Sequence, residues 1–270
     1  MNRRLLVLGP LALLVGGCPP PPVARPYAPP SAEELYAAVT GRAAAIQTQR
    51  TETKVDLLAD KDQRVKLGVT FLTQAPNRLR MEAEGPFSTA VASLASDGAD
   101  FQFLDIRNNR FLAGPAQPCS IARLIRVALR PSDVVAVLDG VAPIIDSAPD
   151  ARAVDWDPHH GGREVLRLRG ADGSVETLEF DARERRWDLV DAELRDGRGQ
   201  VVWHVEHQDF ALVEGGGPLR LPGRSAITQP SRNADARIRY KSRELGVTPP
   251  EGVFQLAPPP GIPVEQVSCD

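Results

Sequence analysis

The sequence predicts a mainly antiparallel β protein with a few helices, in which helices plug the concave face of one strongly curved sheet. Three observations favour this fold class. Short segments of alternating apolar and polar residues follow one another along much of the chain, turn signals rich in Gly, Asp and Asn separate them, and helical spacing is confined to three stretches. Consecutive short strands with tight turns are typical of an antiparallel meander rather than of βαβ units.

The composition is that of a folded globular protein with charges of both signs. Of the 270 residues 42% are apolar and 5% are aromatic, and the formal net charge is -3. Basic and acidic side chains are mixed along the chain, without a basic stripe or a polybasic patch. We therefore expect no nucleic-acid partner.

The N-terminal stretch MNRRLLVLGPLALLVGGC has the three parts of an export signal. Arg3 and Arg4 form a positive start, residues 5–15 form a short apolar core, and two glycines precede Cys18. The apolar core is too short for a transmembrane helix, which needs about 20 residues. The ending VGGC resembles the bacterial lipobox, whose cysteine becomes the new N-terminus and carries acyl chains such as palmitate. We expect residues 1–17 to be a signal peptide and Cys18 to be lipidated; the alternative is an ordinary signal peptide that contains a cysteine.

The proline-rich residues 18–30 are expected to form a stiff, extended tether between the lipid anchor and the folded part. Two or three acyl chains, at about 0.8 kcal/mol per buried CH2, would make the anchor effectively permanent. Pro19 follows the cysteine, where some bacteria use Asp for inner-membrane retention. The expected location is therefore the cell envelope, on the periplasmic leaflet of the outer membrane. Residues 31–270 are expected to form a single domain, with a division into two domains near residue 145 as the alternative.

The folded part begins with a predicted helix over residues 31–50. Ser31 is a suitable N-cap and Glu34 completes a capping box. Leu35 and Val39 then recur at helical spacing.

Five short strands are predicted after this helix. In RVKLGVTFLTQ the apolar residues Val65, Leu67, Val69 and Phe71 alternate with Lys, Gly and Thr, so the apolar set falls on one face. The predicted strands are 64–74, 77–84, 87–96, 100–106 and 107–114.

Helical spacing returns over residues 120–140. The segment SIARLIRVAL places its apolar residues on one helical face, and RPSDVVAVLDG opens a second helix at Pro131 and closes it at Gly140. Hairpin turns such as GADGS and RDGRG then separate a second group of strands. These strands are predicted at 163–169, 174–180, 185–195, 200–210, 219–228 and 235–245, before a proline-bounded end at 249–261.

Two cysteines remain once Cys18 is assigned to the anchor. Cys119 and Cys269 form an even pair in a protein that is expected to leave the cytoplasm, so they are disulfide candidates. Two unpaired, partly exposed thiols are the alternative.

No motif of catalysis or metal binding is evident. The adjacent His159 and His160 have no third ligand at a recognisable spacing, and His204 and His207 lie three apart on a predicted strand, which turns them to opposite faces. The chain contains no G-x-S-x-G elbow, P-loop, dinucleotide fingerprint or H-E-x-x-H. We expect a protein that is not an enzyme and that needs no metal or cofactor.

The order of elements, on a lipid anchor, resembles the LolA/LolB family of periplasmic lipoprotein carriers and receptors, and most closely the outer-membrane receptor LolB. Four stretches carry the resemblance: PNRLRMEAEGPFSTAVASL, DGADFQFLDIRNNRF, IARLIRVALRPSDVVAVLDGVAP and the ending EGVFQLAPPPG. It covers residues 31–260, although only 64–143 is specific, and the second half departs through longer charged hairpins.

The resemblance implies a half-open β-barrel, closed by helices, with an apolar cavity for acyl chains. The candidate cavity residues are Val69, Phe71, Leu79, Met81, Val91, Phe101, Phe103, Leu124, Ile125 and Leu138. The alternative is a dry, filled core, which alternating strands produce by themselves. By position, Phe87 corresponds to a hydrophobic residue that protrudes from a turn of LolB-like receptors and helps to deliver lipoprotein to the membrane; it could instead be the first inward residue of its strand.

The function expected from this resemblance is binding of acyl chains or lipoproteins by a monomer that is held at the membrane by its lipid anchor. A periplasmic carrier protein is a further expected partner. The alternative is a non-enzymatic envelope scaffold or sensor that uses the same fold to bind a partner protein.

Overall fold

The computed structural model describes residues 22–58, 63–159 and 161–269, which form sixteen strands and three α-helices. The elements of the first half are α1 (Ala32–Ala45), β1 (Thr48–Leu58), β2 (Arg64–Gln74), β3 (Arg78–Glu84), β4 (Ala90–Ser96), β5 (Asp100–Asp105), β6 (Arg110–Pro115), α2 (Pro118–Ile125) and α3 (Pro131–Leu138). Those of the second half are β7 (Arg152–Asp157), β8 (Arg163–Arg169), β9 (Val175–Asp181), β10 (Asp188–Arg195), β11 (Val201–Gln208), β12 (Ala211–Leu212), β13 (Arg220–Leu221), β14 (Arg224–Gln229), β15 (Ala234–Leu245) and β16 (Val264–Gln266).

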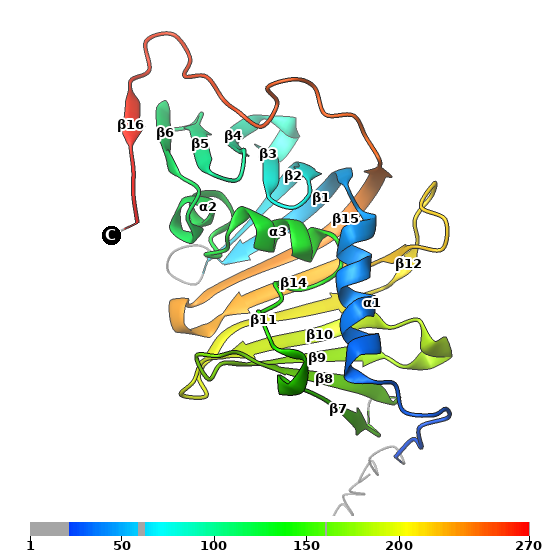
Figure 1. The fold of residues 1–270 in the computed structure, drawn as a ribbon. Coiled ribbons are helices and arrows are strands. Elements are labelled where there is room, and N and C mark those ends of the chain that lie inside the picture. The colour runs from blue at the N-terminus through cyan, green and yellow to red at the C-terminus, as the bar shows by residue number, and fades with distance from the viewer. Residues whose placement is uncertain (1–21, 59–62, 160, 270) are drawn as a thin grey trace, which may run out of the picture.

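Fourteen of these strands form one sheet in the order β16-β6-β5-β4-β3-β2-β1-β15-β14-β11-β10-β9-β8-β7, and β12 and β13 form a separate pair. Neighbours in the large sheet are antiparallel, apart from the parallel pair of β16 and β6. The sheet is curved and does not close into a barrel (Figure 1). The predicted mainly antiparallel class is therefore confirmed.

The two halves of the sheet are joined in its middle. β1 pairs with β2 on one side and with β15 on the other, so the two groups of strands form one continuous sheet. β-Bulges interrupt the register between β1 and β15 and between β3 and β4. Because a bulge bends a strand and increases its twist, these irregularities favour a curved sheet.

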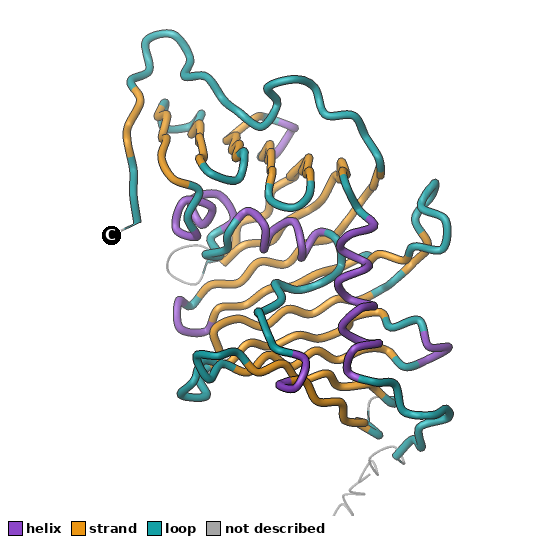
Figure 2. The backbone as a smooth tube through the Cα atoms, in the orientation of Figure 1, coloured by secondary structure: helices purple, strands orange, loops and turns teal. Residues whose placement is uncertain are grey.

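The three helices lie over one face of the sheet (Figure 1 and Figure 2). α1 contacts β7 and β8, and α3 contacts β3. Leu35 and Val39 of α1 belong to the same hydrophobic core as the buried residues of α2 and α3. The buried carboxylate of Asp188 on β10 holds α1 in place, because it accepts hydrogen bonds from Arg42 and Arg220, each at 2.9 Å.

Several parts of the sequence differ from their predicted structure, among them the strand predicted over 219–228, which is divided into β13 and β14 of two different sheets. The helix predicted over 31–50 ends at Ala45, and Thr48 already begins β1, which alternation did not reveal. The reason is that the first inward residues of β1, Gln49, Thr51 and Thr53, are polar and yet buried. β7 and the short β16 were also not predicted.

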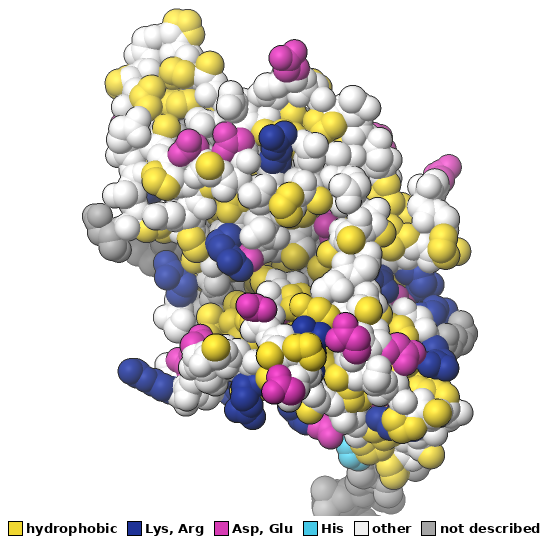
Figure 3. Space-filling view, in the orientation of Figure 1, with side chains coloured by type: hydrophobic (Ala, Val, Ile, Leu, Met, Phe, Trp, Pro, Cys, Tyr) yellow, Lys and Arg dark blue, Asp and Glu magenta, His cyan; other side chains and the backbone are white. Residues whose placement is uncertain are grey.

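None of the helices in the part of the chain described combines the length and the apolar character needed to cross a bilayer. The face that carries the helices mixes apolar side chains with basic and acidic ones (Figure 3).

Candidate functional site

The ten residues predicted to line an apolar cavity come together in one core. They lie on four neighbouring strands, β2 to β5, and on α2 and α3, and none of them is more than 8% exposed. They are Val69, Phe71, Leu79, Met81, Val91, Phe101, Phe103, Leu124, Ile125 and Leu138. The strands and helices expected to surround a lipid therefore do surround one apolar region.

This apolar region is filled in the structure. Ile121 of α2 and Val134 and Val137 of α3 are buried in the same core. The void that remains beneath the two helices is bounded by apolar side chains of both helices and of β1, β2, β14 and β15, and its volume is about 20 Å³. A void of that size holds about one water molecule. An acyl chain can enter here only if a helix moves.

The start of α2 is fixed by a disulfide. Cys119, in the first turn of α2, is bonded to Cys269, with the two Cα atoms 6.0 Å apart. Shortly before Cys269, Glu265 of β16 accepts a hydrogen bond from Nε of Arg110 on β6 at 2.9 Å. The predicted pairing of the two cysteines is confirmed, and it ties the C-terminal segment to a helix that covers the core.

The segment between α2 and α3 is fixed by one side chain of the sheet. Gln229 at the end of β14 accepts a hydrogen bond from the Ala128 N–H at 2.9 Å and donates one to the Ala128 carbonyl at 2.8 Å. Arg126, with φ 62°, ends α2 in the left-handed conformation, and Arg130 and Asp133 form a capping box that begins α3. The connection is therefore held by specific contacts on both sides.

The end of α3 is fixed by a buried cluster of polar groups, the α3 cluster: Gln49, Asp139, His207, Ser225, Tyr240 and Arg243. In its first part the Gln49 amide donates to the carboxyl of Asp139, and Nη1 of Arg243 donates to the Leu138 carbonyl at 2.7 Å and to Gln49 Oε1 at 3.0 Å. Burial raises the pKa of Asp139 well above its usual value, although Arg243 and Gln49 oppose the shift.

The second part of the α3 cluster holds the chain that follows α3. Nε2 of His207 lies 2.9 Å from the Val141 carbonyl, which can only accept, so Nε2 carries the proton and Nδ1 accepts from the Ser225 hydroxyl at 2.8 Å. The Tyr240 hydroxyl lies 2.9 Å from the same Ser225 oxygen. Burial lowers the pKa of His207 to about 4, so this side chain is neutral at physiological pH.

The sequence offered one weak signal for the α3 cluster. Its members lie far apart in the chain, and none belongs to a recognisable motif. His207 is nevertheless turned to the inner face of β11 and His204 to the outer face, as the strand period predicts. A polar residue at an inward position of an alternating strand is thus the sign that could have pointed to the cluster.

Phe87 protrudes from the turn between β3 and β4. The turn is a short 3-10 segment, Pro86–Ser88, closed by a hydrogen bond from the Gly85 N–H to the Thr89 carbonyl at 2.9 Å. Phe87 has φ 61°, in the region that favours Gly, and its side chain is 101% exposed. β4 begins only at Ala90, so Phe87 is not the first inward residue of that strand. A large ring held in water by a strained backbone is a candidate for contact with an apolar partner.

The histidines that were considered as metal ligands have different surroundings. His159 is exposed in a loop, and His160 lies outside the described residues. Nε2 of His204 lies 2.7 Å from Asp191 Oδ2, a contact that raises the pKa of His204, and Glu206 lies close enough to complete a group of three ligand atoms within 4.8 Å. Because His204 already has an ion-pair partner in Asp191, we assign no metal to this group of three residues.

The predicted tether lies partly against the body of the protein. Cys18 and the predicted signal peptide fall outside the described residues. The Val23 N–H donates to the Pro158 carbonyl at 2.8 Å, and Arg25 donates to the buried carboxylate of Glu164 at 3.0 Å. The ring of Tyr27 contacts two tryptophans edge to face. From Val23 onward the segment therefore packs against the end of the sheet and is not the extended spacer that was predicted, because aromatic and ionic partners are available there.

Comparison with known proteins identifies the fold. No protein-family model and no curated protein matches the chain. Among solved structures, a LolA superfamily protein from Nitrosomonas europaea matches with a TM-score of 0.53 at 12% identity, over 84% of this chain and 99% of that one. The chain has a LolA/LolB-like fold. 

Two further structures share the LolA-like fold of this chain. A DUF1329 family protein from Desulfovibrio piger matches with a TM-score of 0.59 at 10% identity, over 84% of this chain and 98% of that one. A candidate outer membrane lipoprotein-sorting protein domain from Vibrio parahaemolyticus matches with a TM-score of 0.55 at 10% identity, over 83% of this chain and 97% of that one. At such identities the likeness concerns the fold alone.

Proposed function

We propose that the chain is a lipid-anchored envelope protein that binds acyl chains between its sheet and the helices α2 and α3, in the localisation of lipoproteins or another lipid at the outer membrane. The observation that carries the proposal is the single apolar core of a LolA-like sheet, covered by two short helices. In this proposal α2 and α3 plug the concave face, and Cys18 anchors the protein as in the receptor LolB. The role requires no catalytic group, so we propose a binding protein rather than an enzyme.

Binding requires the filled core to open. An acyl chain of about 15 methylenes loses roughly 12 kcal/mol of unfavourable hydration when it is fully buried. This driving force acts against the cost of moving α2 or α3, whose contacts with the core are apolar. Only the open fraction of the protein is competent to bind, so the apparent affinity falls with that fraction.

Phe87 is an exposed apolar side chain at a turn of the sheet, where a partner can reach it without any change in the core. Its ring is free in solvent and its backbone is strained, so replacing it affects little of the fold. We assign it the delivery role that the corresponding position has in LolB-like receptors, with a periplasmic carrier protein as the donor of the cargo.

The test is a titration of the full chain, held in phosphatidylcholine nanodiscs, with a fluorescent acyl-chain probe and an unlabelled fatty acid as competitor. Gln229→Met removes both hydrogen bonds to Ala128 and keeps the volume of the side chain, so it should raise the open fraction and tighten probe binding about tenfold. Gln200→Met, at an exposed turn, is the matched control and should not differ from the wild type. Absence of displaceable binding at micromolar probe in both the wild type and Gln229→Met would refute an acyl site under the helices.

The filled core favours one second candidate function. If the core stays closed, we propose instead that the domain is a scaffold or sensor that binds a partner protein with its surface. In that case the probe does not bind, and Phe87→Glu leaves cellular function intact while changes in the charged hairpins abolish it.

A further inference from the structure

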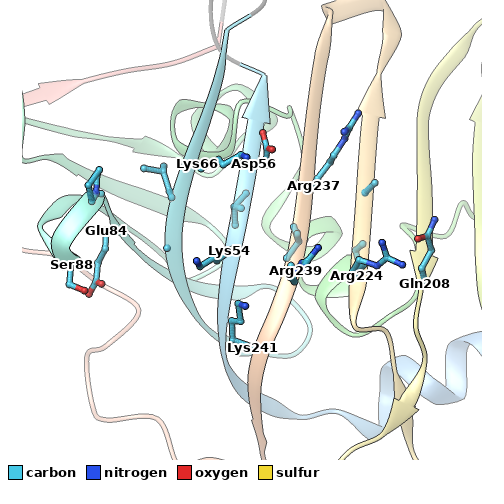
Figure 4. Close-up of a pocket in the computed structure, with 18 of the residues that line it drawn as sticks. Lys54, Asp56, Lys66, Glu84, Ser88, Gln208, Arg224, Arg237, Arg239 and Lys241 are labelled. Atoms are coloured by element: carbon cyan, nitrogen blue, oxygen red, sulfur yellow. The ribbon is translucent and has the colours of Figure 1, made fainter.

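A groove of about 1020 Å³ crosses the sheet on the face turned away from the helices (Figure 4). Its side chains alternate along β1 and β15 with residues of the core, and others come from β2, β11, β14 and the turn after β3. Six cations line it, against the three carboxylates of Asp56, Glu84 and Glu206: these cations are Lys54, Lys66, Arg224, Arg237, Arg239 and Lys241. The positive excess is thus a local feature of a chain whose net charge is -3.

Backbone pairing places three of these cations in one row. Lys54 on β1 is directly opposite Arg239 on β15, which is directly opposite Arg224 on β14. Adjacent strands are about 4.8 Å apart, so the three residues fall within roughly 10 Å. Lys241 is the extra residue of the bulge in β15, and Figure 4 shows its side chain next to this row.

The row is only partly neutralised. Like charges directly opposite one another on adjacent strands destabilise a sheet. Arg224 is paired with Asp209 at 2.5 Å, whereas Lys54 and Arg239 have no ion pair or hydrogen-bonded side chain within the described part of the chain. Asp56, the next outward residue of β1, is paired with Arg64 at 2.6 Å. An unfavourable arrangement that lies in a concave surface is typical of a binding site.

One end of the groove carries an exposed aromatic ring next to the carboxylate of Glu84, which lies directly opposite Gly68 on β3. Gly68 continues the row on β2, next to Lys54, and a Cβ at that position would come no closer than 3.9 Å to its neighbours. Packing therefore does not require Gly here, and the missing side chain leaves the floor of the groove open. The exposed Pro86 and Phe87 line the groove beyond it. Cations and an aromatic ring thus line the same concave surface.

We propose that this groove binds a single phosphate-bearing amphiphile, with the phosphate on Lys54, Arg239 and Lys241 and the apolar part against Pro86 and Phe87. A free phosphate ion would use neither the volume of the groove nor the ring of Phe87. A flat bilayer surface would not fit the concavity, so a lipid taken singly is the better match. The site is on the opposite face from the core under α2 and α3, and it does not depend on acyl binding there.

The experiment uses the full chain in phosphatidylcholine nanodiscs and isothermal titration calorimetry with water-soluble dihexanoyl phosphatidic acid, corrected for empty nanodiscs. Inorganic phosphate and dihexanoyl phosphatidylcholine are titrated in parallel. The test variant is Lys54→Gln with Arg239→Gln. The matched control is Arg198→Gln with Arg232→Gln, which removes the same charge from exposed positions outside the groove. Thermal unfolding of both variants verifies folding, and the test variant should be at least as stable as the wild type because a repulsion is removed.

We expect saturable binding of the phosphatidic acid, weakened at least about tenfold in the test variant and less than about twofold in the control. Inorganic phosphate should bind at least about tenfold more weakly, and Phe87→Ser should bring the phosphatidic acid close to that level. The proposal is overturned if the wild type does not bind, if both double variants lose affinity equally, or if inorganic phosphate binds as tightly as the amphiphile.

Discussion

The side-chain carboxyl of Glu176 is buried, and this burial makes the stability of the protein depend on pH. It lies on β9 with no exposed surface, and its Oε2 accepts a hydrogen bond from the Ile145 N–H at 2.8 Å. Its Oε1 has no partner among the described residues. Burial raises the pKa of Glu176 from 4.5 to about 8, and the Ile145 hydrogen bond opposes only part of this shift. We predict that Glu176→Gln, which cannot ionise and keeps the acceptor for Ile145, stabilises the fold at neutral pH.

The magnitude follows from the two pKa values. Between pH 4.5 and about 8 the folded state retains a proton that the unfolded state releases, so the free energy of unfolding falls as the pH rises. The loss is about 1.4 kcal/mol per pH unit, which gives roughly 3 kcal/mol at pH 7. The contribution of Glu176 is fully present below pH 4.5 and is lost as the pH approaches 8. Glu176→Gln should therefore exceed the wild type by about 3 kcal/mol at pH 7 and match it at pH 4.5.

Urea unfolding of the two proteins between pH 4.5 and 8.5 measures this difference, and taking the difference cancels the titration of every other group, His207 included. Glu244→Gln, on an exposed position of β15, is the control and should follow the wild type at each pH. A difference for Glu176→Gln that is independent of pH, or a variant less stable than the wild type at pH 8, would show that Glu176 is not buried as a neutral acid.

Three further predictions concern the stability of the fold. Cys119→Ser opens a loop of 150 residues and should lower the free energy of unfolding by up to about 5 kcal/mol, measured by urea unfolding; a midpoint equal to that of the oxidised wild type would contradict it. Asp188→Asn removes the buried carboxylate that pairs with the half-buried Arg42 and Arg220 and should cost about 3 kcal/mol by the same assay, whereas a loss under about 1 kcal/mol would show that α1 is held by apolar contacts alone. Phe87→Gly relieves a left-handed backbone and removes no packing, so the thermal midpoint should stay equal or rise; a clear fall would mean that the ring contacts the protein.

The strands could be predicted where their inward residues are apolar. Val69 and Phe71 on β2 and Leu79 and Met81 on β3 alternate with polar residues, and the structure buries all four. β1 was not predicted because its first inward residues are polar. Its threonines can be buried because they form hydrogen bonds: the Thr53 hydroxyl, for example, donates to the Val69 carbonyl at 2.7 Å. A local pattern of hydrophobicity cannot reveal a strand whose inward side chains are stabilised by partners far along the chain.

The features of the candidate site also differ in whether the sequence alone could predict them. The apolar residues under α2 and α3 follow from periodicity, and Phe87 followed from the resemblance. The row of Lys54 and Arg239 could not be predicted, because it depends on which strands are neighbours and on a bulge that shifts the register of β15. The α3 cluster likewise joins Gln49 to Asp139 and Arg243, residues that only the folded chain brings together.

The contacts around α2 and α3 constrain how the core can open. The disulfide at Cys119 ties the start of α2 covalently to the C-terminal segment, whose strand β16 pairs with β6, so this end of α2 is the more strongly held one. The link at Ala128 consists of two hydrogen bonds to Gln229, and the end of α3 is held by Arg243 and its neighbours in the α3 cluster. Individual hydrogen bonds contribute about 1 kcal/mol each, far less than a covalent bond. Any opening therefore swings α3 and the connection at Ala128 away from the sheet about the start of α2, and a lipid would enter from the side of β1, β14 and β15, where the small void already lies.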